Sequence, residues 1–172
     1  MVPFAVGSWP TTSSRLTLPF SIRLFYGFLR DKWPTSSTTY NISFDGEGEF
    51  HSIGGDENLI THILTNLLSN AIKYSPERGL ISFRLYQDQG DAVFEVADEG
   101  PGIPEPEREK VFEAFYKGVD PPVAAVKGSG LGLSIVKEYV TLHRGRIEIL
   151  EGPGAHFRIR LPRRQREVEA AA

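Results

Sequence analysis

Three glycines at alternate positions, Gly128, Gly130 and Gly132, run directly into a segment with the apolar periodicity of a helix. Glycine inside a helix costs about 1 kcal/mol relative to alanine, so this run needs a physical reason. The first amides of a helix lack intrahelical partners and carry partial positive charge from the helix dipole. Because glycine lets an anion approach such amides closely, the run predicts a phosphate-binding loop. A flexible glycine-containing loop is the alternative, since neither common phosphate-loop pattern is present.

A second candidate is the segment DEGPGI, which begins with Asp98 and contains Gly100 and Gly102. Asp98 ends a segment that alternates with period two, and it falls on the apolar face of that segment. A carboxylate buried there needs a hydrogen-bond donor, because burial without a partner is costly. The exocyclic amine of adenine is such a donor, and the two glycines would let a flat ring lie against the backbone. A turn capped by an aspartate is the alternative interpretation.

A third candidate is a polar row formed by Asn66, Asn70 and Lys73, which follow i, i+4, i+7 spacing. On a helix these residues stack along one side, at the border of the apolar face. Amide oxygens one turn apart suit Mg²⁺, a hard cation that prefers oxygen ligands. Lys73 would reach phosphate from the same side. Two helical asparagines with local hydrogen bonds are the alternative.

The four histidines do not form a pair with metal-binding spacing, and we interpret them as structural or exposed: His51, His62, His143 and His156.

The elements that must position these groups follow from hydrophobic periodicity. DENLITHILTNLLSNAIKYSPE predicts a helix that Asp56 caps and that Pro76 ends. GLISFRLYQ and DAVFEVAD predict antiparallel strands joined by a turn at residues 88–91. PEREKVFEAFYKG predicts a short helix that ends near Gly118.

The second half continues with a loop, an amphipathic helix in LGLSIVKEYVTLH, and a strand pair in RIEILE and AHFRIRLP. A further strand is expected from residue 41. This order predicts an α+β fold, a two-layer α/β sandwich with helices on one face of a mixed, mostly antiparallel sheet.

Composition limits the other possibilities. The chain has 172 residues, a net charge of -3 and no cysteine. These values argue against a nucleic-acid partner and exclude disulfides and thiolate metal sites. No apolar run approaches the roughly 20 residues of a membrane span, and no signal peptide is evident, so we expect a cytoplasmic protein. Residues 1–40 predict an irregular segment, residues 41–163 the domain, and residues 164–172 a solvated tail.

Three motifs occur in a fixed order: NLLSNAIKY, DEGPGI and GSGLGL, with VFEAFYK between the last two. Together they resemble the ATP-binding catalytic domain of bacterial sensor histidine kinases, part of the group shared with gyrase, Hsp90 and MutL. The resemblance covers about residues 41–162. It implies a Bergerat-type ATP-binding fold with ATP and Mg²⁺ as cofactors.

The resemblance also implies a set of nucleotide-binding residues: Asn66, Asn70, Lys73, Tyr74, Asp98, Gly100, Gly102, Ile103, Phe115, Lys117, Gly128, Ser129, Gly130, Leu131 and Gly132. In this set Asn70 is the implied Mg²⁺ ligand, with Asn66 assisting it or the phosphates. Asp98 is implied to bind the adenine amine. Lys117 is implied to face the phosphates.

Two aromatic residues, Phe112 and Phe115, match the box that anchors the ATP lid in this family. The lid itself would be residues 118–127. The glycine run would then close over the triphosphate.

The resemblance implies phosphotransfer rather than hydrolysis. Gyrase-like ATPases use a glutamate to activate water, and Asn66 stands at that position here. An amide cannot act as a general base. The acceptor would be a histidine on a dimerisation domain, and residues 1–56 lack the sequence context of such a histidine. The expected enzyme is therefore a protein histidine kinase catalytic domain, monomeric in isolation, whose pathway ends at a response regulator.

Two alternatives of other classes stay open from the sequence. One is a stand-alone regulator of the anti-sigma, serine-kinase type, which has a similar length. The other is a nucleotide-sensing module without catalysis.

Overall fold

The computed structural model describes residues 41–47, 56–118 and 128–162. The elements in chain order are β1 (Asn41–Glu47), α2 (Glu57–Tyr74), β2 (Leu80–Asp88), β3 (Asp91–Ala97), the 3-10 turns η1 (Glu105–Glu107) and η2 (Lys110–Phe112), α4 (Gly132–Leu142), β4 (Arg146–Leu150) and β5 (His156–Leu161). The irregular segment predicted for residues 1–40, the tail predicted for 164–172, and residues 119–127 of the predicted lid lie outside the described residues.

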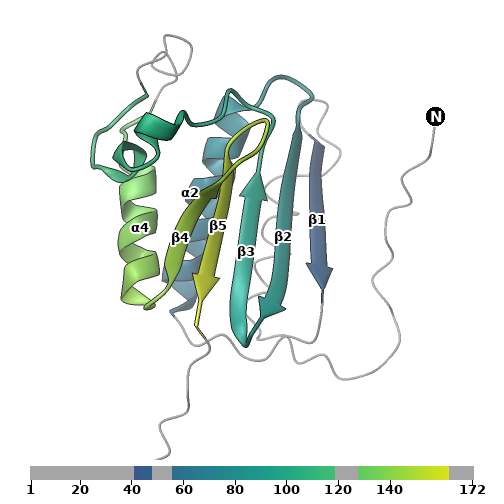
Figure 1. Ribbon diagram of the computed structural model, residues 1–172, viewed down its shortest axis with the longest axis vertical. Helices are drawn as coiled ribbons and strands as arrows, with labels where there is room; N and C mark the ends of the chain where they lie inside the picture. The colour runs from purple at the N-terminus through teal and green to yellow at the C-terminus, as the bar shows by residue number, and fades with distance from the viewer. Residues whose placement is uncertain (1–40, 48–55, 119–127, 163–172) are drawn as a thin grey trace, which may run out of the picture.

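The strands form one sheet in the order β1-β2-β3-β5-β4. β1 runs parallel to β2, and the other neighbouring pairs are antiparallel. Helices α2 and α4 lie against one face of this sheet (Figure 1). The predicted two-layer α+β sandwich with a mixed, mostly antiparallel sheet is therefore confirmed.

Helix α2 begins and ends where the sequence predicts. The Asp56 carboxylate accepts hydrogen bonds from the backbone amides of Asn58 at 2.8 Å and Leu59 at 3.2 Å. These bonds satisfy two of the amides that a helix start leaves unpaired. The helix ends at Tyr74, two residues before Pro76, which cannot continue it.

The core lies between the two helices and the inner face of the sheet. Apolar side chains on one side of each helix meet alternate residues of β2, β3 and β5. Its fully buried members are Ile63, Leu64, Leu67, Leu68, Ile81, Val96, Val136, Val140, Ile159 and Leu161. The helices are thus held by the same burial that fixes which face each strand turns inward.

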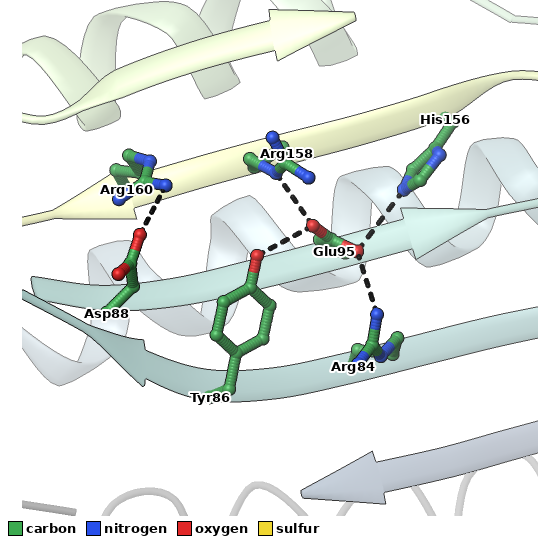
Figure 2. A network of polar contacts seen from close by, with 7 residues as sticks. All are labelled: Arg84, Tyr86, Asp88, Glu95, His156, Arg158 and Arg160. Carbon is green, nitrogen blue, oxygen red and sulfur yellow. Dashed lines mark hydrogen bonds and ion pairs between the residues drawn. The ribbon is translucent and has the colours of Figure 1, made fainter. Parts of the chain in front are cut away.

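The outer face of the sheet carries a polar network instead (Figure 2). At its centre is Glu95, only 4% exposed, whose carboxylate accepts from Arg158 Nε at 2.7 Å and from the Tyr86 hydroxyl at 2.8 Å. Arg84 and His156 approach its other oxygen at 3.8 and 3.4 Å. This face has no helix over it among the described elements, and charged side chains from β2 and β5 cover Glu95 instead.

The short helix predicted for residues 106–118 was wrong. The segment forms the two 3-10 turns η1 and η2 and then bends. Phe115 has a φ of 66°, which no helix accommodates. Its amide donates to Gly130 O at 2.9 Å rather than to a carbonyl one turn earlier. A contact with a distant part of the chain therefore replaced the local helix.

Candidate functional site

A cavity of about 200 Å³ lies among the second half of α2, the loop after β3, and the segments on either side of residues 119–127. It brings together most of the predicted nucleotide-binding residues. Those that line it are Asn66, Asn70, Lys73, Tyr74, Asp98, Gly102, Ile103, Lys117, Gly128, Ser129, Gly130 and Gly132. Residues from three separate motifs thus share one cavity, although long stretches of chain separate them.

Three residues of the predicted set do not line the cavity: Gly100, Phe115 and Leu131. Gly100 supports the site by holding Asp98, because its amide donates to Asp98 Oδ1 at 2.8 Å. A Cβ at Gly100 would lie 2.7 Å from Tyr74 O, so only glycine fits between Asp98 and the end of α2. Leu131 precedes the first turn of α4 as its N-cap residue.

The two aromatic residues of the predicted box have different environments. Phe112 packs on the core and meets the Phe157 ring edge-on at 6.4 Å. The Phe115 side chain is 72% exposed and does not line the cavity. In the described residues, Phe112 therefore anchors this segment to the fold, and Phe115 does not.

Asp98 is the buried carboxylate of the site, and it is 7% exposed. Its Oδ1 accepts two backbone hydrogen bonds, from Gly100 N at 2.8 Å and from Ala155 N at 3.0 Å. Burial raises the pKa of this carboxyl, and the two amides only partly oppose that shift. Within the described chain both bonds go to Oδ1, which leaves Oδ2 for a donor in the cavity.

The chain can pass this closely only because of a glycine that the sequence analysis did not single out. A Cβ at Gly154 would clash with the backbone carbonyl oxygen of Asp98. Gly154 therefore lets the β4–β5 loop reach β3, and the next residue, Ala155, supplies one of the two amides that hold Asp98. The signal for this approach in the sequence is the glycine content of GPGA, residues 152–155, between the two predicted strands.

The polar row on α2 faces the start of α4. A Cβ at Gly132 would lie 3.2 Å from Asn66 Oδ1 and 3.9 Å from Asn70 Nδ2. Asn66 donates its amide hydrogen to His62 O at 3.0 Å, which leaves Oδ1 as an acceptor. Helix α4 has no side-chain N-cap. Its first amides are thus available to an anion beside the side-chain amides of Asn66 and Asn70.

Gly130 joins the two segments that flank residues 119–127. Its φ is 74°, and a Cβ there would lie 2.7 Å from Phe115 C. The hydrogen bond from Phe115 N to Gly130 O closes this approach. Lys117, which precedes residues 119–127, and Gly128, which follows them, both line the cavity.

Some cavity residues were missed by the sequence analysis. The main ones are Glu107, which is 9% exposed, Tyr116, and Phe157 on the inner face of β5. Burial, together with the neighbouring Glu107 carboxylate, raises the pKa of the Tyr116 hydroxyl. The alternation of β5 indicated that Phe157 points inward, but Glu107 lies in a segment with no periodic signal.

The described residues contain no group of three or more His, Asp or Glu side chains that could hold a metal ion. Neither α2 nor any other helix among them combines the length and the hydropathy of a membrane span.

Comparison with known proteins identifies the family to which this fold belongs. The family model described as histidine kinase-, DNA gyrase B- and HSP90-like ATPase matches residues 55–165. The chain belongs to this family. The sensor histidine kinase TmoS of Ectopseudomonas mendocina is 42% identical over 135 residues, which are 70% of this chain and 14% of TmoS.

Solved structures of histidine kinases share the fold. The mycobacterial sensor histidine kinase MprB matches with a TM-score of 0.66 and 32% identity, over 84% of this chain and 94% of that one. Full-length ShkA in complex with AMPPNP matches with a TM-score of 0.65 and 26% identity, over 83% of this chain and 29% of that one. The chain is thus a histidine-kinase ATP-binding catalytic domain, and it spans only a small part of TmoS.

Proposed function

We propose that this domain binds Mg-ATP in the cavity and presents the γ-phosphate to a histidine of a helical dimerisation domain. That domain would be supplied by a longer protein or by a second chain, and a response regulator would receive the phosphate afterwards. The observation that carries this proposal is the position of Asp98, buried at the cavity with one oxygen held by two backbone amides. Its other oxygen suits the adenine amine, which guanine does not offer at that place.

The opposite end of the cavity suits the triphosphate. The uncapped start of α4 offers backbone amides, and Lys73 and Lys117 line the same cavity. Together they would neutralise the negative charge of the phosphates. The full-length ShkA structure was solved with AMPPNP, an ATP analogue, and that match supports the same ligand class here.

The residues present fit Mg²⁺. Asn66 Oδ1 lies beside the uncapped helix start, the Asn70 side-chain amide lies next to it, and the described residues contain no carboxylate cluster there. Such a donor set suits an ion that keeps several waters and takes its other ligands from phosphate. The bound ion would neutralise charge on the transferred phosphoryl group. Asn66 cannot act as a general base, so positioning of the γ-phosphate rather than activation of water is expected from this chain.

The comparisons favour the histidine kinase over the anti-sigma type of serine kinase, because the relatives named above are sensor histidine kinases. The proposed activity is therefore that of a protein histidine kinase.

The test is calorimetric titration of the full chain with a non-hydrolysable ATP analogue, with and without Mg²⁺, and with GTP as the control. We expect binding that depends on Mg²⁺ and selects adenine. Phosphotransfer from ATP to a purified histidine-bearing dimerisation domain should then follow. A folded chain that does not bind the analogue would contradict the proposal, and binding without transfer would favour the nucleotide-sensing module.

A further inference from the structure

The end of α4 is joined to the start of α2 by one histidine side chain. His143 Nε2 accepts a hydrogen bond from the backbone amide of Asp56 at 3.1 Å. Its Nδ1 lies 2.7 Å from the backbone carbonyl oxygen of Tyr139, one turn earlier in α4. The two bonded residues, Asp56 and His143, lie 87 positions apart in the chain.

These two contacts fix the state of the imidazole. A carbonyl oxygen only accepts, so Nδ1 must carry the hydrogen that it donates to Tyr139 O. The Asp56 amide only donates, so Nε2 must keep its lone pair. In this arrangement Nδ1 is the donor, Nε2 is the acceptor, and both ring nitrogens are used. Because its ring position is determined at both nitrogens, the side chain acts as a defined spacer between the two helices.

The same two helices meet again at the nucleotide site. At its start, α4 approaches the middle of α2, where a Cβ on Gly132 would lie 3.2 Å from Asn66 Oδ1. At its end, α4 meets the start of α2 through His143. The helices are therefore antiparallel, and the His143 contact lies one helix length away from the phosphate end of the cavity. For 11 residues that length is about 16 Å.

Between these two points the helix pair is held by apolar packing and one ring contact. Val136 and Val140 are buried in the core, and the Tyr139 ring meets His62 of α2 at 6.2 Å. Such contacts hold α4 against α2 and the sheet through burial and close packing. The hydrogen bond of His143 adds a directional contact at the end of α4, which restricts how far α4 can shift along α2.

We propose that His143 is a positioning residue of the nucleotide site, which sets the separation between the first turn of α4 and the side-chain amides of Asn66 and Asn70. This inference rests on the proposed function, since those groups form the phosphate and Mg²⁺ end of the cavity. The base end is formed by Asp98 and its partners on the β3 and β5 side, which His143 does not contact. Loss of the His143 contact should therefore weaken the binding of the phosphates and leave the binding of the base unchanged.

The experiment compares variants of the full chain in their affinity for the Mg²⁺-bound ATP analogue and for adenosine, with thermal unfolding measured for each. For His143→Ala we expect a loss of roughly three- to ten-fold in affinity for the Mg²⁺-bound analogue, in keeping with the loss of one hydrogen bond, and no loss for adenosine. His143→Gln should restore most of the affinity, because its amide oxygen can accept from Asp56 N. His143→Leu keeps the volume of the side chain without its hydrogen bonds, and it replaces His143→Ala if that variant does not fold.

The matched control is His62→Ala, which removes the other histidine at this helix contact. Among the described contacts, the His62 side chain meets Tyr139 only ring to ring. We expect its affinity for the Mg²⁺-bound analogue to stay within two-fold of the unaltered chain, as a rough limit for a contact without a hydrogen bond.

Several outcomes would overturn the inference. These are an unchanged affinity for the Mg²⁺-bound analogue in both His143→Ala and His143→Leu, an equal loss for the analogue and for adenosine, or no recovery in His143→Gln. If the unaltered chain itself does not bind the Mg²⁺-bound analogue, the proposed function fails first, and the positioning role fails with it.

Discussion

Two buried carboxylates, one within β3 and one directly after it, have opposite electrostatic environments. Glu95 points to the outer face of the sheet, where burial alone would raise its pKa, but Arg158, Tyr86 and His156 outweigh burial and lower it. Asp98 follows the same strand on the inner side, where burial raises its pKa and only the backbone amides of Gly100 and Ala155 oppose the shift. Both are less than a tenth exposed.

The difference lies in how the charge of each carboxylate is compensated. Glu95 has cations from two neighbouring strands, so its charge is compensated within the protein. Asp98 has neutral partners on one oxygen, so its ionised form is incompletely compensated until a donor enters the cavity. A carboxylate without a cation is costly for folding, and such groups gather at binding sites. We therefore expect Glu95 to matter for stability and Asp98 for the ligand.

The largest effect should come from Asp98→Asn. The amide keeps an oxygen for the two backbone donors but places an NH₂ group where the adenine amine must donate. We expect ATP affinity to fall about 100-fold or more, because two donors would then face each other in a buried site. Calorimetric titration measures this change, and an unchanged affinity would refute the role of Asp98 in reading the base.

The melting temperature of the same variant also tests the contrast between Glu95 and Asp98. The pKa of Asp98 is raised in the folded state, so its contribution to stability is present at low pH and is lost as pH rises through the folded-state pKa. At neutral pH the ionised group therefore costs stability. We expect the melting temperature of Asp98→Asn at pH 7 to equal or exceed that of the unaltered chain, whereas a marked fall would mean that Asp98 is mainly structural.

The second largest effect should come from Glu95→Gln, and here stability rather than ligand affinity should change. Arg158 and Arg84 would lose the negative charge that they pair with. We expect the free energy of unfolding to fall by about 1–3 kcal/mol, less than for a fully buried ion pair, because both arginines are partly solvated. The nucleotide affinity of the folded variant should not change. Urea unfolding at pH 7 measures the stability, and a loss of ATP binding at unchanged stability would break the comparison.

The pH dependence of that difference has a defined sign. The pKa of Glu95 is lowered from its ordinary 4.5, so the stability that it contributes is present above that value and is lost as pH falls through the folded-state pKa. The stability gap between the unaltered chain and Glu95→Gln should therefore narrow as the pH falls below about 4.5. A stability difference that stays constant at acidic pH would mean that packing rather than charge causes it.

The third effect concerns the metal. Asn70→Ala removes an amide oxygen from the polar row on α2, and we expect roughly ten-fold weaker binding of the ATP analogue when Mg²⁺ is present. With a chelator, the two proteins should bind alike. Titrations under both conditions test this, and equal weakening in both would count against Asn70 as a metal ligand.

The smallest effect should come from Tyr86→Phe, which removes one hydroxyl that donates to Glu95 at 2.8 Å. The arginines remain, so we expect a loss of about 1 kcal/mol in the free energy of unfolding. ATP affinity should be unaffected, since Tyr86 lies on the outer face (Figure 2). A stability loss as large as that of Glu95→Gln would mean that the tyrosine, rather than the arginines, holds the network.

The sequence by itself determined the elements and the direction of many side chains. The cap at Asp56 and the 3.6-residue period defined α2, and the alternation of β3 placed Asp98 on the inner face. These features are local, because helix caps and strand alternation depend on residues a few positions apart. Motif order then indicated which of these residues share a nucleotide site, and the cavity contains most of them.

Only the tertiary structure decided which distant groups meet. Ala155 reaches Asp98 because β5 pairs with β3, and Phe115 turns to Gly130 instead of extending a helix. His143, interpreted from the sequence as structural or exposed, proved to be the hydrogen-bond link between two helices. Each of these contacts joins residues far apart in the chain. Local propensity contains no information on such pairs, because packing of the whole sheet and both helices brings them together.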